Sequence, residues 1–201
     1  MTKRYARLTT GGVVEYLRRV PHVVNASEAD FEAYAADHGY KEFVGAGERP
    51  GRFYELEYVE TADELRAVWA PWELDRARTA ALDEVQQLRD MRMHGAAGVT
   101  IECEKLPNGI KFDTEAMSYA TGLGVLTAKG GGIPEGTTWT DADDETHELT
   151  AELLEGIVSA MQGHVKAVQE YFTPYRDAIR AAETVDEVEA ALPQPNAFLN
   201  Q

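Results

Sequence analysis

The stretch TAELLEGIVSAMQGHVKAVQEY, residues 150–171, has the pattern of a long amphipathic helix. Thr150 can cap its N-terminus, because a threonine hydroxyl accepts a hydrogen bond from a free amide of the first turn. Apolar side chains then recur three and four positions apart, which places them on one helix face. This stripe comprises Leu153, Ile157, Ala160, Met161, His164, Val165 and Val168. We predict that the helix packs into a core through the stripe and that Pro174 interrupts it.

Short strands and helices are predicted on both sides of this helix. Pro107-Asn108-Gly109 is expected to turn one strand into the next, and Asp113 or Thr114 can cap a helix towards Leu126. Thr184 begins a capping box for a last short helix. The predicted strands are residues 99–103, 110–112, 137–140 and 147–149. Together they predict a second α+β unit, a β-hairpin and short sheet packed with the long helix, with Trp139 in the same core.

The first part of the chain predicts a separate small α+β unit. Two strands, 5–8 and 13–17, flank Thr10-Gly11-Gly12, which suits a tight hairpin turn. Ser27 and Asp30 form a capping-box pattern for a short helix that Gly39 ends. Further strands are expected at 40–44 and 52–59.

Between the two units, residues 73–94 predict a helix without proline or glycine. Leu74, Ala81 and Leu88 are spaced by seven, and Trp69 and Trp72 precede them. One interpretation is a connecting helix packed on its own domain, with both tryptophans closing the first core. The other is that Trp69, Trp72, Leu74, Ala81 and Leu88 form an interface with a partner or with a second copy.

The fold class expected is therefore α+β, with two small α+β units joined by a helix. We predict an N-terminal domain (1–72), a connecting helix (73–94), a C-terminal domain (95–192) and a Pro-rich tail (193–201).

The net charge of the chain indicates which classes of partner it can bind. Of the 201 residues, 35 are Asp or Glu and 19 are Lys or Arg, for a net charge of −16. Residues 95–201 alone hold 18 acidic and 6 basic side chains. Since nucleic acids and anionic lipids attract basic surfaces, we expect no nucleic acid partner and no membrane partner. Arg18, Arg19 and Pro21 interrupt the best apolar segment near the N-terminus, so neither a signal peptide nor a membrane span is predicted.

The densest set of potential metal ligands lies at residues 141–148. Asp141, Asp143, Glu145 and Glu152 fall at positions 1, 3, 5 and 12 of a calcium loop, with Asp144, His147 and Glu148 beside them. Thr146 stands where that loop needs glycine, and the segment before Asp141 is predicted as a strand rather than a helix. Two interpretations remain, a solvated turn between strands and an adventitious cation site.

Signatures of catalysis are missing elsewhere. The five histidines show no zinc-ligand spacing, and His164 is expected to be a core imidazole with one hydrogen-bond partner. Cys103 shares a strand face with Val99 and Ile101, which indicates a small buried side chain rather than a nucleophile. The glycines of residues 129–136 lack the context of a phosphate loop. We therefore predict no enzyme, no cofactor, no metal and no catalytic residue.

The second half of the chain resembles a family of phage-tail-associated domains of unknown function, found beside or fused to tail-fibre components. The likeness is carried by Arg89, Gly98-Val99-Thr100, residues 109–114 with Ser118, residues 138–143 and 147–152, His164-Val165, Ile179 and residues 181–185. Residues 4–92 resemble the N-terminal part of small phage tail proteins through Tyr5-Ala6-Arg7-Leu8, residues 12–16, Trp69, Trp72-Glu73-Leu74 and residues 89–92. The Lys129–Gly136 loop and the Pro-rich end depart from these patterns.

This resemblance implies a phage protein that is made in the host cytoplasm and binds other tail or fibre proteins in the virion. One class is a structural subunit of a tail, baseplate or fibre. Another is a tail-fibre assembly chaperone that is absent from the mature particle. A third is a tail enzyme such as a wall hydrolase, which would need a cleft with converging carboxylates. The resemblance implies no particular site residues.

Overall fold

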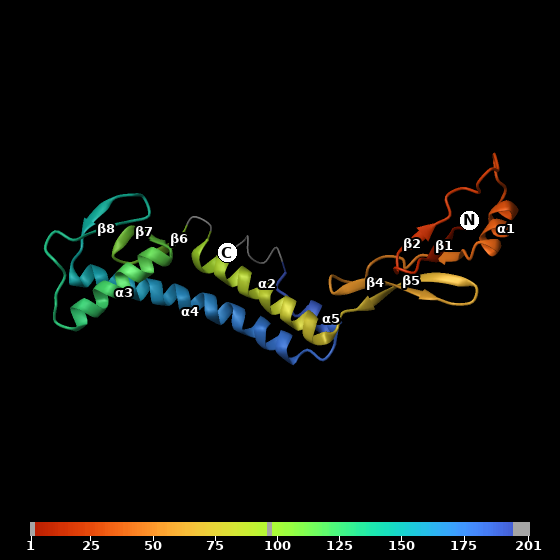
Figure 1. The fold of residues 1–201 in the computed structure, drawn as a ribbon. Helices are drawn as coiled ribbons and strands as arrows, with labels where there is room; N and C mark the ends of the chain where they lie inside the picture. The colour runs from red at the N-terminus through yellow and green to blue at the C-terminus, as the bar shows by residue number, and fades with distance from the viewer. Residues whose placement is uncertain (1–2, 96–97, 195–201) are drawn as a thin grey trace. The chain divides into compact units, whose positions relative to one another are not determined.

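The fold was analysed in a computed structural model that describes residues 3–95 and 98–194. The chain divides into two compact units, Met1–Ala77 (unit 1) and Arg78–Gln201 (unit 2) (Figure 1). Both combine helices with open sheets, so the predicted α+β class is confirmed. The predicted Pro-rich tail lies outside the described residues from position 195 onward.

Unit 1 is a five-stranded sheet with one helix. The strands are β1 (Tyr5–Leu8), β2 (Val14–Tyr16), β3 (Lys41–Val44), β4 (Tyr54–Glu60) and β5 (Glu64–Pro71). Their order in the sheet is β2-β1-β3-β5-β4, with β3 and β5 parallel and the other pairs antiparallel. Leu65 and Ala67 of β5 are buried in its core.

Local signals placed most of these elements correctly. The first hairpin is confirmed, and so is the capping box of α1 (Glu28–Asp37), where Ser27 and Asp30 satisfy each other's backbone amides. Strand β5 was not predicted. Its glutamate and alanines have low strand propensity, and pairing with β4 and β3 on its two sides outweighs that propensity.

Unit 2 is built around helices. Most of α2 (Leu74–His94) belongs to it, followed by the hairpin of β6 (Val99–Cys103) and β7 (Leu106–Phe112) and by α3 (Thr114–Ala128). A second hairpin pairs β8 (Thr138–Thr140) with β9 (Thr146–Glu148). The chain then forms α4 (Ala151–Ala181) and α5 (Val185–Ala190). Thr150 caps α4, as predicted. Asp113 caps α3, which is one of the two caps that the sequence allowed for this helix.

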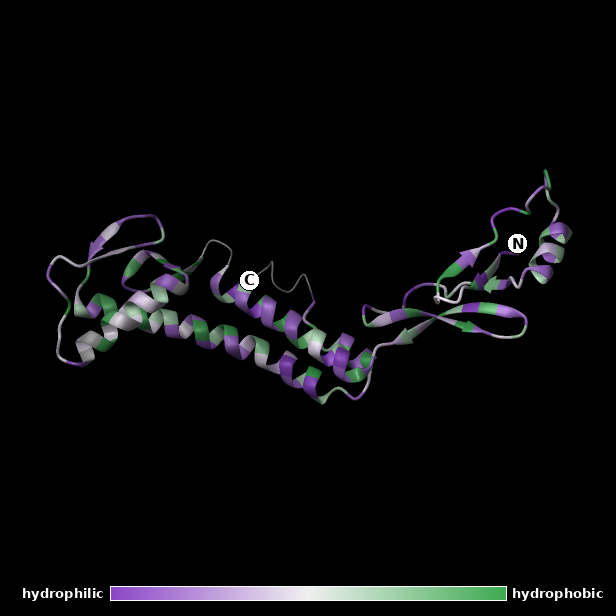
Figure 2. Ribbon diagram, in the orientation of Figure 1, coloured by the Kyte–Doolittle hydropathy of each residue, from purple (hydrophilic) through white to green (hydrophobic). Residues whose placement is uncertain are grey.

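Helix α4 packs along its whole length. Its first half contacts α3 and β6, and its second half lies antiparallel to α2 and contacts α5 (Figure 1). Figure 2 shows hydrophobic bands recurring along α4, in agreement with the predicted stripe. Ile157, Met161 and Val168 of the predicted stripe are buried. The buried stripe also includes Leu154, Phe172 and Ile179, which were not predicted, whereas the predicted members Leu153, Ala160, His164 and Val165 are half-buried. Trp139 is also buried, with its ring stacked on Tyr119 of α3.

Helices α2 and α4 cap each other's C-terminal ends. His164 of α4 contacts the Met93 carbonyl oxygen at 3.1 Å, and because a carbonyl only accepts, the imidazole Nε2 is the donor. Arg78 of α2 donates through Nε and Nη2 to the Ala182 carbonyl oxygen, at 3.2 and 2.6 Å. Both carbonyls belong to the helix-end set that lacks intrahelical partners. These bonds fix the register of the two helices.

The prediction that Pro174 interrupts α4 was wrong. Proline cannot donate to the Glu170 carbonyl, but Pro174 lies on the exposed side, where water can satisfy that oxygen. The Thr173 hydroxyl donates to the Gln169 carbonyl at 2.8 Å. Phe172 and Ile179 are fully buried on either side, so packing keeps the helix continuous.

The hairpin turn was also predicted at the wrong place. Cys103 pairs with Leu106, so the turn is formed by Glu104 and Lys105. Pro107-Asn108-Gly109 instead forms a bulge within β7, since Ile101 pairs with Ile110. Gly109 has a φ of 75°, and a Cβ there would lie 2.5 Å from the Ile101 carbonyl oxygen. Only glycine fits this bulge.

We expect Ile157→Asp to unfold unit 2, because an unpaired carboxylate would replace a fully buried side chain on α4. Ile157→Val is the matched control and should cost only about 1 kcal/mol. Thermal unfolding followed by circular dichroism measures both variants. A melting temperature for Ile157→Asp equal to that of the parent would show that this face is not core.

Gly109→Ala should lower the free energy of unfolding by about 1–3 kcal/mol, since the alanine would need a left-handed conformation and would crowd the Ile101 carbonyl. Gly163→Ala, within α4 and with open space around its Cβ position, should raise it by about 0.5–1 kcal/mol. Denaturant titrations of the two variants compare them directly. Equal effects would contradict the role assigned to the bulge.

Candidate functional site

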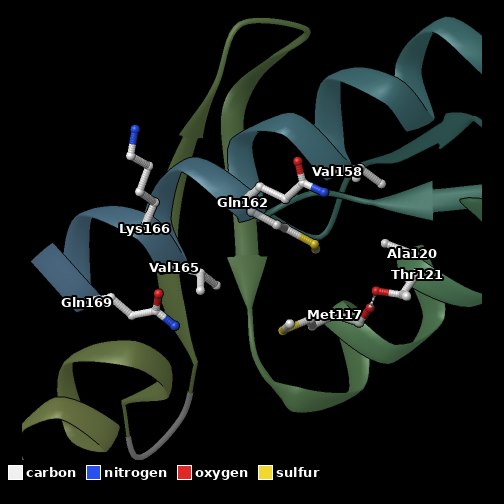
Figure 3. Close-up of a pocket in the computed structure, with 9 residues that line it drawn as sticks. Met117, Ala120, Thr121, Val158, Gln162, Val165, Lys166 and Gln169 are labelled. Carbon is white, nitrogen blue, oxygen red and sulfur yellow. Dashed lines mark hydrogen bonds between the residues drawn. The ribbon is translucent and has the colours of Figure 1, made fainter.

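A groove lies between α3 and α4, with a cavity volume of about 300 Å³ (Figure 3). Met117, Ala120 and Thr121 of α3 form one wall. The other wall comes from α4 and consists of Val158, Met161, Gln162, Val165, Lys166 and Gln169. The Thr121 hydroxyl donates to the Met117 carbonyl at 2.7 Å, so it is held within its own helix. The groove therefore offers mainly apolar contacts.

Three apolar side chains of α3 are exposed. Met117, Tyr119 and Val125 are 39%, 48% and 48% exposed. Lys166 is the one charged side chain among the described residues that line the groove. An apolar groove between two helices suits the apolar face of a protein segment more than a charged ligand.

The predicted interface residues are divided between the two units. In unit 1, Trp69 is half-buried at the end of β5 and its indole N–H donates to the Gly47 carbonyl at 3.3 Å. Trp72 is also half-buried, 5.6 Å from Phe53 between ring centroids, with the Arg76 guanidinium 3.9 Å above its ring. Both tryptophans contact neighbours within unit 1.

The predicted helix residues differ in exposure. Leu74, in unit 1, and Leu88, in unit 2, are half-buried. Ala81 is fully buried, so its side chain is not presented to a partner. The interface that includes these residues stays a prediction.

The acidic turn is organised around the buried carboxylate of Asp141. Its Oδ1 accepts the backbone amides of Asp143 and Glu145, each at 3.0 Å. Its Oδ2 accepts from the Asn108 side chain at 3.0 Å and from Nε2 of His147 at 2.8 Å. The β7 bulge thus docks on this turn through Asn108.

Hydrogen bonding and burial act in opposite directions on the pKa of Asp141. Burial by itself would raise the pKa of this carboxyl group. The hydrogen bonds from His147, the Glu145 amide, Asn108 and the Asp143 amide outweigh burial and lower the pKa to about 2. Asp141 is therefore an ionised structural acceptor that fixes the β8–β9 turn.

Three potential metal ligands meet at this turn. One ligand atom from each of Asp141, Glu145 and His147 lies within 4.8 Å of the others. Asp143, Asp144 and Glu148 are exposed. Each oxygen of Asp141 already accepts two hydrogen bonds. The hydrogen bonds of the turn therefore explain why these three side chains lie close together.

Residues 76–192 match a family described as a domain of unknown function, DUF4376. The chain belongs to the DUF4376 family. This match covers the greater part of the chain and nearly all described residues of unit 2. No curated protein and no solved structure matches the chain.

The groove, the turn, α4 and all but the first two residues of α2 lie within the DUF4376 match. Within residues 3–95 and 98–194, no helix is both long enough and apolar enough to cross a bilayer. Cys103 is buried, as predicted, and His164 has the single hydrogen-bond partner expected of a core imidazole.

Sequence reasoning missed the groove. Val165 and Met161 were assigned to the core stripe, whereas Val165 is half-buried and both line the groove. A signal was present in α3, whose 15 residues include one charged side chain, Glu115, and apolar side chains on several faces. Such a helix cannot bury all of its apolar surface against one neighbour.

Asp141→Asn should destabilise unit 2 at neutral pH, because the new amide group would oppose donors that already point at this position. The folded pKa of Asp141 lies below the unfolded value of about 3.9, so its stabilising effect is present above that value and is lost as the pH falls towards 2. The variant should therefore lose less stability than the parent between about pH 5 and pH 2.

Asp143→Asn is the control, since Asp143 is exposed and contributes only its backbone amide to the turn. Chemical denaturation at a series of pH values measures all three proteins. If Asp141→Asn and the parent had the same pH dependence, Asp141 would not be the ionised acceptor described.

Proposed function

We propose that this chain is a bacteriophage tail protein, a structural subunit of the tail, baseplate or fibre that acts by binding other tail proteins. The sequence resemblance described above supports the phage assignment. The observation that carries the binding role is the apolar groove between α3 and α4. We propose further that the protein is located in the virion.

The lining of the groove favours an apolar, weakly charged protein segment as its ligand. The walls of the groove come from α3 and α4, which pack against each other. The surface therefore exists before a partner binds. Met117 lines the groove and is partly exposed, and such side chains serve as anchors in protein interfaces. Around it, unit 2 carries 21 acidic and 9 basic residues, which disfavours anionic partners.

The subunit proposal is separated from the chaperone alternative by the composition of mature particles. Quantitative mass spectrometry of purified phage should find this protein in fixed proportion to known tail proteins. A chaperone would be present in infected-cell lysate and absent from the particle. That second result would overturn the subunit proposal.

Met117→Glu should reduce incorporation into particles by about tenfold or more, because it places a charge in the apolar groove. The matched control is Met91→Glu, on α2, at a methionine that is 66% exposed and outside the groove. Phage carrying each variant are purified and the protein is quantified per particle. Normal incorporation of a folded Met117→Glu protein would show that the groove is not the contact surface.

A further inference from the structure

A second hollow lies between α2 and α4, about 160 Å³ in volume and mostly polar in its lining. Arg89 comes from α2, and Gln169, Phe172, Thr173 and Arg176 come from α4. Phe172 is fully buried and forms the apolar base. Two arginines from different helices thus line one small space.

The two arginines differ in their partners. Arg89 donates from Nη2 and Nε to Asp90 Oδ1 at 3.0 and 3.3 Å, and Gln86 donates to both oxygens of the same carboxylate. The hydrogen bonds from Gln86 and, to a smaller extent, from Arg89 lower the pKa of Asp90. Asp90 is therefore ionised and holds Arg89 in place, while the other nitrogen of that guanidinium group, Nη1, makes no bond to it.

No described carboxylate forms an ion pair with Arg176. The acidic residues nearest to it along α4 are paired elsewhere, Asp177 with Arg180 at 3.5 Å and Glu170 with Lys166 at 3.7 Å. This is unexpected in a unit with 21 acidic and 9 basic residues. Two like charges beside one hollow repel each other unless an anion lies between them.

From this arrangement we propose that Arg89 and Arg176 form a binding site for a single oxyanion, either a carboxylate or a phosphate group. Guanidinium groups bind both through paired N–H donors, and two of them from opposite walls can surround one such group. Gln169 also lines the hollow, and its side-chain amide is a further donor. The hollow is too small for a nucleotide, because ligand pockets for molecules of that size are about 300 Å³ or larger.

The oxyanion site and the groove are neighbours on α4. Gln169 lines both hollows, and Val158, Val165, Gln169 and Arg176 recur along α4 at spacings of seven, four and seven, which keeps them on one helix face. A protein segment in the groove that ends in one acidic side chain would place that side chain near Arg176. The oxyanion site itself does not depend on the proposed function.

The test uses the full chain, labelled for NMR, and two probes that separate the two sources of the anion. N-acetyl-glutamate amide supplies one side-chain carboxylate, and inorganic phosphate supplies a phosphate group. Each is titrated into the protein in the millimolar range while the arginine Nε–Hε signals are recorded. Arg176→Gln and Arg89→Gln are compared with Arg180→Gln, which removes the next arginine on α4, outside the hollow.

We expect saturable shifts of the Arg89 and Arg176 signals with at least one probe. Affinity should fall about tenfold or more in Arg176→Gln and Arg89→Gln and stay unchanged in Arg180→Gln. The probe that binds more tightly identifies the source, and either identity supports the site. The inference would be overturned if neither probe saturated, or if Arg176→Gln bound as tightly as Arg180→Gln. Because no partner protein is involved, this result is independent of the particle experiments.

Discussion

The antiparallel pairing of α2 with α4 is the constraint on which the rest of unit 2 depends. A helix leaves its last carbonyls without partners, and here each helix supplies the missing donor to the other. His164 bonds to the Met93 carbonyl, and Arg78 bonds to the Ala182 carbonyl. The two bonds lie near opposite ends of the pair, so sliding by one turn would break both and misplace the buried stripe. They set the register in which Arg89 opposes Arg176.

Helix α4 connects this pairing to the remainder of the domain. Its buried residues run from Leu154 to Ile179, and different neighbours cover the two ends. Near its start, α3 and the β6–β7 hairpin pack against it and leave the apolar groove between the helices. Further along the same face, α2 replaces α3 as the neighbour and the lining becomes cationic. One helix therefore carries two chemically different surfaces side by side.

The turn around Asp141 has a structural role in this arrangement. It accepts a hydrogen bond from Asn108 in the β7 bulge and one from His147 in β9, and so ties the two hairpins of unit 2 together. The acidic residues at 141–148 thus consist of one buried acceptor, Asp141, surrounded by exposed carboxylates.

Local signals in the sequence located much of this fold. Thr150, Ser27 and Thr184 begin helices where expected, because a cap depends on residues three positions apart in the chain. Two predictions failed where long-range packing outweighs local preference. Pro174 is tolerated within α4, and Pro107-Asn108-Gly109 forms a bulge instead of a turn.

The candidate sites were harder to predict, because they also depend on long-range packing. The groove and the two-arginine hollow each combine residues from helices distant in sequence, and no spacing within one segment encodes them. Arg89 is one of the residues that carry the sequence resemblance, and no local pattern singles out Arg176.

Helix α4 is one continuous helix against which α2, α3, α5 and β6 pack, and native-state hydrogen exchange tests this continuity. The continuity predicts that the amides of the buried stripe, on both sides of Pro174, exchange together through one cooperative opening with a similar free energy. It would be contradicted if the amides after Pro174 exchanged much faster than those around Ile157, as expected of two independently opening segments.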